Sequence, residues 1–250
     1  GLTTSTFYRG ILVGPGPTNV PSLTIRGCEV LGLSSAINEI ASSGGGTVDI
    51  FNSRIVGDRN GIFIYGNLWH VFSSDIRVEP KAGASGFPVI VSSAVSLGGT
   101  DNSQFWGSHL HAEDALGIYI TAVSDSKTGG STAFVGCTLH MKVTTSAGAS
   151  SRRQTVYSTT SGSNVKTNFV GSDLIYETPS DLTSGYIGGL LWTGSGPAHA
   201  INLIGSEIID MGGSGGTQLQ NGDIARGDIM GFGSALKPTI RSPGATAVGT

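Results

Sequence analysis

The chain has 250 residues, of which 40 are glycine, 38% are hydrophobic and 12% are charged, and its formal net charge at pH 7 is -3. The hydrophobic fraction is too high for a disordered chain, and the charge balance leaves no basic stripe, so neither nucleic acid nor an anionic membrane surface is expected as a partner. No apolar run approaches the ~18 residues of a membrane span, so membrane insertion is not expected.

Residues 1–20 contain one short apolar segment, residues 7–13, which ends at a Gly-Pro-Gly-Pro sequence. We interpret residues 1–20 as the end of a preceding coil or as an N-terminal cap. Gly1 begins in the middle of a repeating strand pattern, so further sequence or a partner chain is expected before it.

From residue 21 to 237 the chain repeats one pattern, which consists of an apolar strand, a two-residue kink and a second strand. Successive kinks lie 21 to 35 residues apart, a period typical of stacked repeat proteins. One residue of each kink must adopt a left-handed backbone conformation, which Gly, Asn and Ser tolerate best. The eight kinks are Gly27-Cys28, Asn52-Ser53, Ser73-Ser74, Gly107-Ser108, Gly136-Cys137, Gly171-Ser172, Gly205-Ser206 and Gly233-Ser234.

A third strand is expected in most repeats after a loop of variable length, at residues 61–65, 87–91, 116–120, 155–157 and 189–192. Three short strands per repeat predict an all-β fold, a single-stranded right-handed parallel β-helix of about eight coils. Residues 21–237 would form this one domain. Residues 238–250, rich in Gly, Ala, Thr and Pro, are expected to be a C-terminal linker or tail.

Cys28 and Cys137 occupy the same kink position in the first and fifth coils, where the other coils have serine. Four stacking steps of about 4.8 Å would separate them by roughly 19 Å, whereas a disulfide needs Cα atoms within about 7 Å. Both are therefore predicted to be free, buried thiols.

The repeat of strand, Gly/Asn kink, Ser and strand resembles the pectate-lyase-like β-helix superfamily. Its low charge and its Gly, Ser and Thr content are similar to those of bacteriophage tailspike and tail-fibre shafts. This resemblance implies a homotrimer and a place outside the cell or on a virion surface. It does not imply one activity, because the fold carries lyases, hydrolases, esterases and binding proteins.

The second strands of coils three to six carry the most informative side chains. Strand residues alternate between two faces, so the residues two, four and six positions after the first kink residue should face outward. These residues are Asp75, Arg77, Glu79, His109, His111, Glu113, Thr138, His140, Lys142, Asp173, Ile175 and Glu177. Between them lie apolar residues that should fill the core.

One interpretation of this face is a catalytic groove for a saccharide. Glu79, Glu113 and Glu177 share a column, and carboxylates ~5 to ~9.5 Å apart suit glycoside hydrolysis. His140 or Lys142 could instead abstract a proton beside a uronate, as in a lyase.

A second interpretation is saccharide binding without cleavage, and a third is a solvated polar face. The binding residues would be Asp75, Arg77, His109, His111 and Asp173, with Trp69 and Trp106 as platforms for sugar rings. Each tryptophan could equally seal the core or a subunit contact.

His109 and His111, with His140 nearby, could also converge on a metal ion. Histidines on neighbouring strands more often face solvent, so no metal or other cofactor is expected.

The function that this resemblance implies is a structural and receptor-binding module of a phage tail spike or fibre that recognises cell-surface polysaccharide of the host. The alternative is a polysaccharide-degrading hydrolase or lyase acting on the second-strand face of coils three to six.

Overall fold

The computed structural model describes residues 9–13, 22–39, 46–64, 68–79, 93–97, 103–120, 131–142, 153–158, 166–177, 187–192, 200–211, 228–231 and 239–241. Every regular element in these ranges is a β-strand, which confirms the predicted all-β class for this part of the chain. Among the same residues, no helix has the length and apolar character needed to cross a membrane.

The strands form three sheets, which we call the first, second and third sheet. The first sheet contains β2 (Ser22–Arg26), β5 (Thr47–Phe51), β8 (Leu68–Phe72), β11 (Gln104–Trp106), β14 (Ser131–Val135), β17 (Lys166–Val170), β20 (Ala200–Ile204) and β22 (Asp228–Gly231). The second sheet contains β3 (Glu29–Gly32), β6 (Arg54–Gly57), β9 (Asp75–Val78), β12 (His109–Glu113), β15 (Thr138–Lys142), β18 (Asp173–Glu177), β21 (Glu207–Asp210) and β23 (Thr239–Arg241). The third sheet contains β1 (Arg9–Val13), β4 (Ser35–Glu39), β7 (Asn60–Ile64), β10 (Ser93–Leu97), β13 (Leu116–Ile120), β16 (Arg153–Ser158) and β19 (Ile187–Trp192).

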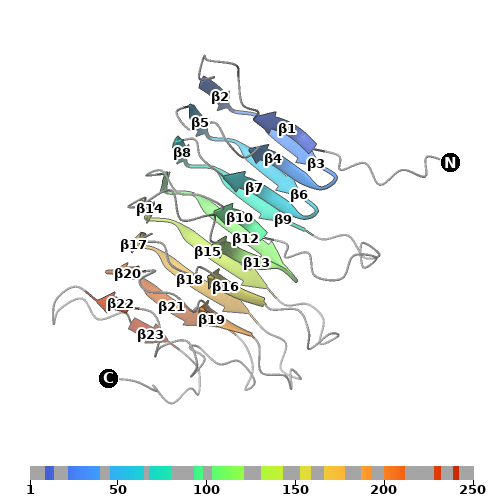
Figure 1. Ribbon diagram of the computed structural model, residues 1–250. Coiled ribbons are helices and arrows are strands. Elements are labelled where there is room, and N and C mark those ends of the chain that lie inside the picture. The colour runs from blue at the N-terminus through green and yellow to red at the C-terminus, as the bar shows by residue number, and fades with distance from the viewer. Residues whose placement is uncertain are drawn as a thin grey trace.

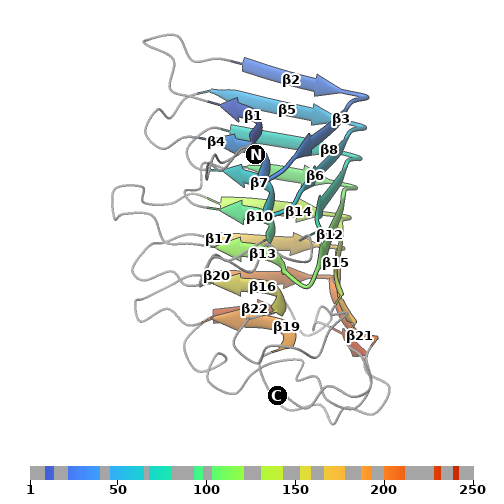
Figure 2. The same cartoon turned by 90° about the vertical axis from the view of Figure 1, so that its right-hand side faces the viewer.

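Neighbouring strands in each sheet are parallel and come from successive repeats. The chain passes from the first sheet to the second and then to the third, so three consecutive strands such as β8, β9 and β10 form one unit. Figure 1 and Figure 2 show the units stacked in sequence order from the blue end to the orange end. Any residue on a strand therefore lies beside its counterparts in the units before and after.

Two expectations about strand position differ from the structure. The strand of the third sheet in the third unit is Ser93–Leu97, whereas the predicted segment 87–91 lies outside the described residues. Thr239–Arg241 forms a strand that pairs with β21, so the prediction of a linker or tail for residues 238–250 is wrong at these positions. A strand of three residues is too short for its alternation to be recognised in the sequence.

The core is built by strict alternation along the strands. On β12, Leu110 and Ala112 are fully buried while the residues on either side are half-buried. Buried side chains from all three sheets belong to one hydrophobic cluster. Phe134 stacks between Phe105 and Phe169 of the neighbouring units, with ring centroids 4.6 and 5.2 Å away. Each unit therefore covers the apolar interior of the next.

The kinks between first and second strands have the predicted backbone conformation. Their first residues have φ values from 46° to 60° in seven units, and two of these residues, Asn52 and Ser73, are not glycine. The eighth predicted kink, at residues 233–234, lies outside the described residues.

A ladder of serine hydroxyls connects these kinks from unit to unit. The backbone N–H of Ser53 donates to Ser74 Oγ at 3.1 Å, and that of Cys137 donates to Ser172 Oγ at 3.1 Å. Ser74 Oγ in turn donates to the carbonyl of Phe72 at 2.8 Å. The left-handed turn removes this N–H from the regular strand ladder, so the buried hydroxyl supplies the acceptor that a buried donor requires.

The two cysteines are both free, as predicted, but they differ in burial. Cys137 is buried and Cys28 is exposed, so the prediction of two buried thiols is wrong for Cys28. Cys28 belongs to the first described kink, where no earlier kink in the described part of the chain covers it. Burial raises the pKa of Cys137 to about 11, although hydrogen bonds from its surroundings oppose this shift.

We expect Ser172→Ala to lower the free energy of unfolding by about 1–3 kcal/mol, because it removes the acceptor from the buried N–H of Cys137. Urea unfolding followed by circular dichroism would measure the loss. Ser22→Ala, at an exposed serine that begins β2, is the matched control. Equal effects of the two substitutions would contradict a structural role for the ladder.

We also expect the two thiols to react at very different rates in the folded protein, because the exposed thiol is accessible and the buried one is protonated and covered. At pH 8, a chromogenic disulfide reagent should label one thiol per chain rapidly and the second only after unfolding. Cys28→Ser should abolish the rapid phase, whereas Cys137→Ser should preserve it. Two rapid phases in the wild type would refute the assignment.

Candidate functional site

The second sheet presents a polar face over its central strands β9, β12, β15 and β18. Their outward residues are all half-buried, and the residues between them are fully buried apolar side chains. Strand pairing puts His111 beside Arg77 on one side and beside His140 on the other. The structure therefore brings the predicted second-strand residues onto one face; their roles stay predictions.

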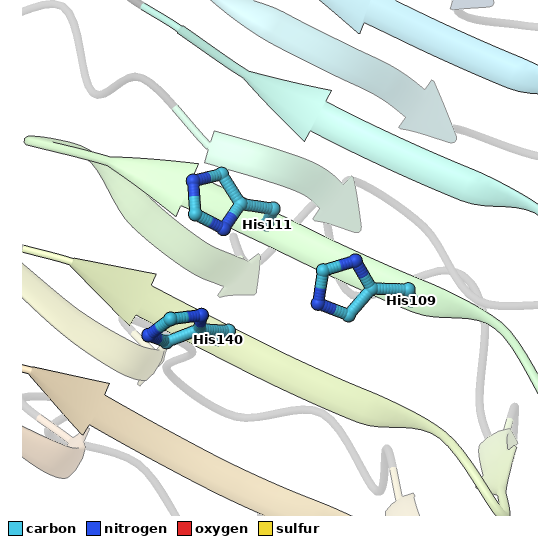
Figure 3. Close-up of side chains that lie close together, drawn as sticks. All are labelled: His109, His111 and His140. Carbon is cyan, nitrogen blue, oxygen red and sulfur yellow. The ribbon is translucent and has the colours of Figure 1, made fainter. Parts of the chain in front are cut away.

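Three histidines meet at the middle of this face. His109 and His111 project from β12, and His140 projects from the adjacent strand β15 (Figure 3). The rings of His111 and His140 lie 5.3 Å apart between centroids in an edge-to-face arrangement, and those of His109 and His111 lie 6.0 Å apart. The two-residue spacing on β12 and the register with β15 produce this cluster.

Beside the cluster, Arg77 forms ion pairs with two carboxylates. Its Nε lies 2.7 Å from Asp75 Oδ2, and its Nη1 lies 3.5 Å from Glu79 Oε1. Asp75 also reaches His109, with 3.3 Å between Oδ1 and Nδ1. Burial alone would lower the pKa of Arg77, but the two carboxylates outweigh it and raise that pKa.

On the other side, Glu177 contacts Lys142 and His140. Its Oε2 lies 3.1 Å from His140 Nε2, and its Oε1 lies 3.2 Å from Lys142 Nζ. Burial alone would raise the pKa of Glu177, but hydrogen bonds and charge from Lys142 and His140 outweigh it, so the pKa falls below its ordinary value. Glu113 lies in register with Lys142, and Asp173 lies in register with Thr138.

Two imidazoles of the cluster, those of His111 and His140, are held in their neutral form. Burial lowers the pKa of His111 to about 4, with further contributions from His140, Arg77 and His109. Burial also lowers the pKa of His140, and Glu177 only partly opposes this. At neutral pH both rings therefore offer one N–H donor and one nitrogen acceptor.

The two predicted tryptophans do not lie on this face. Trp69 is fully buried in the core and donates from Nε1 to Glu39 at 2.9 Å, so its prediction as a sugar platform is wrong. Trp69 precedes the inward-facing Val71 by two positions, and strand alternation therefore turns it inward as well. Trp106 is 42% exposed but belongs to β11 of the first sheet.

An outward apolar stripe on the first sheet was missed by the sequence reasoning. It consists of the residue immediately before the kink in six successive units, and strand pairing aligns its members: Phe51, Phe72, Trp106, Val135, Val170 and Ile204. All are at least partly exposed. Phe51 and Phe72 stack with their rings 5.1 Å apart and nearly parallel. The signal was the presence of apolar residues both one and two positions before the kinks at residues 52, 73, 107, 136, 171 and 205.

Comparisons of the chain with protein-family models, with curated proteins and with solved structures give no significant match. The resemblance to tailspike and pectate-lyase-like proteins therefore stays an expectation.

The shifted pKa of His111 leads to a prediction about pH. Between about pH 6.5 and pH 4 the unfolded chain binds a proton at His111 that the folded protein does not bind, so this contribution to stability is complete above pH 6.5 and declines as the pH falls. A proton NMR titration with a chelator present should give a midpoint near pH 4 for the imidazole signal that His111→Asn removes. A midpoint near 6.5 would contradict the burial of this ring.

Proposed function

We propose that the three sheets close into a single-stranded right-handed parallel β-helix. Two observations support closure: buried residues of all three sheets share one cluster, and Trp69 of the first sheet donates a hydrogen bond to Glu39 of the third. Right-handed crossovers between parallel strands are strongly favoured, which supports the handedness.

We infer that the polar face binds a polysaccharide. The observation that carries this inference is the repetition of half-buried hydrogen-bonding side chains at a constant step along the stack. The spacing between strands is about 4.8 Å, so the face offers a linear array of donors and acceptors. Such an array suits a ligand that is itself a repeat of hydroxyl groups.

The charge state of the face favours binding of a polyol. Neutral His111 and His140 can each donate and accept a hydrogen bond, as a sugar hydroxyl does. Asp75 and Glu177 already have cationic partners, so their remaining lone pairs are held in fixed directions. Ordered side chains lose less conformational entropy when a ligand binds.

Within this proposal, the protein is a structural and receptor-binding module of a phage tail spike or fibre, located outside the cell or on a virion. This context and the homotrimer follow only from the resemblance of the repeat pattern. Exposed Leu31 lies in register with the half-buried Val56, and together with the apolar stripe they offer surfaces for a neighbouring chain.

Polysaccharide cleavage is the second candidate, and Glu177 is the observation that favours it. Lys142 and His140 lower the pKa of Glu177, so its side chain is ready as a base or nucleophile. The same shift makes Glu177 a poor general acid, and Glu79 is paired with Arg77. The general acid would then have to be Glu113, which lies two strands away from Glu177 at the same register position.

Titration of the protein with bacterial capsular polysaccharides and lipopolysaccharide glycans, in the presence of a chelator, tests the proposal. We expect calorimetry to detect saturable binding, and Arg77→Ala or His111→Ala to weaken it about 5- to 10-fold, the effect of losing about 1–1.4 kcal/mol of hydrogen bonding. Assays of new reducing ends and of unsaturated products on the same mixtures report cleavage.

His70→Ala is the matched control, because His70 is a half-buried histidine of the first sheet that contacts Asp49. If this control weakens binding as much as His111→Ala, the second-sheet face is not the binding site. Cleavage that Glu177→Gln abolishes would favour the enzyme instead.

A further inference from the structure

The three histidines of the polar face have the arrangement of a metal-binding site. One nitrogen from each of His109, His111 and His140 can be chosen so that all three atoms lie within 4.8 Å of one another. In Figure 3, one nitrogen of each ring points toward the space between the rings. No other group of three potential ligands is this close in the described part of the chain.

These distances are compatible with one bound ion after small side-chain rotations. A tetrahedral Zn²⁺ with Zn–N bonds of about 2.05 Å separates its ligand nitrogens by about 3.3 Å. The histidines are half-buried on a strand surface, so their rings can turn toward the ion without disturbing the core. Three protein ligands on one face would leave the outward position of the ion open to water or to another ligand.

Carboxylates already orient two of the three rings as in known metal sites. Asp75 contacts His109 at Nδ1, which leaves Nε2 for an ion, and Glu177 contacts His140 at Nε2, which leaves Nδ1. Metal-binding histidines usually donate their second ring N–H to a carboxylate or carbonyl, and this contact fixes the ring and increases its basicity.

The charges around the cluster also favour a cation. The face carries the carboxylates Asp75, Glu79, Glu113, Asp173 and Glu177 against the cations Arg77 and Lys142. Arg77 lies beside His111, but it is neutralised by Asp75 and Glu79, and Lys142 is paired with Glu177.

We propose that His109, His111 and His140 bind one divalent late first-row transition-metal ion, such as Zn²⁺ or Cu²⁺, on the second sheet. Imidazole ligands select these ions over Mg²⁺ and Ca²⁺, which prefer oxygen. This site shares His111 and His140 with the proposed polysaccharide-binding face, but the two kinds of binding are measured separately, so either proposal can fail while the other holds.

The test uses untagged protein freed of metal with a chelator and then dialysed. Calorimetric titration with ZnCl₂ at pH 7.5 should give one ion per chain. His111→Asn and His140→Gln should each weaken the affinity at least 10-fold. Electron paramagnetic resonance of the Cu²⁺-loaded wild type should show coupling to three imidazole nitrogens, and this readout does not depend on any variant folding.

His70→Gln is the control, because it removes a histidine with a carboxylate partner but no neighbouring histidine in contact with it among the described residues. Its affinity for Zn²⁺ should equal that of the wild type. The proposal is overturned if the wild type binds no single ion saturably, if fewer than three nitrogens couple to Cu²⁺, or if His70→Gln weakens binding as much as His111→Asn.

Discussion

The hydrogen-bonded corner between the first and second sheets is the constraint on which the remaining structure depends. At each kink the chain turns through a left-handed residue, and the next N–H leaves the regular strand ladder. In five of the described kinks a buried serine hydroxyl of the following unit accepts it, as at Ser74 and Ser172. This bond fixes successive units in one register, whatever the length of the loops between them. Repeats that differ by up to 14 residues in length, from 21 to 35, can therefore stack without slipping.

The same register produces both the core and the polar face. At inward positions, similar residues of successive units lie side by side. Phe105, Phe134 and Phe169 therefore stack into one apolar column. Outward positions are aligned equally well, but their residues differ from unit to unit. Histidines 29 residues apart in the chain, His111 and His140, become neighbours in this way. A functional surface can thus change by single substitutions without any change in the scaffold.

The charge states of its side chains then determine which ligands the polar face can bind. Arg77 and Lys142 pair with carboxylates of the face, whereas His111 and His140 between them are neutral because burial lowers the pKa of both. Neutral imidazoles suit hydroxyl groups and transition-metal ions alike, because both interactions use the nitrogen lone pair. The proposed polyol and metal ligands therefore depend on one physical property of the cluster.

The sequence by itself determined the kinks, the alternation and the register, because each is a local consequence of backbone conformation and period-two side chains. It therefore predicted the all-β class, the buried column and the neighbours of His140. The tertiary structure alone decided the exposure of Cys28, the strand at Thr239–Arg241 and the pairing of Glu177 with Lys142. These features depend on which neighbouring units cover a side chain and on the orientation that a long, flexible side chain adopts. No local pattern specifies either.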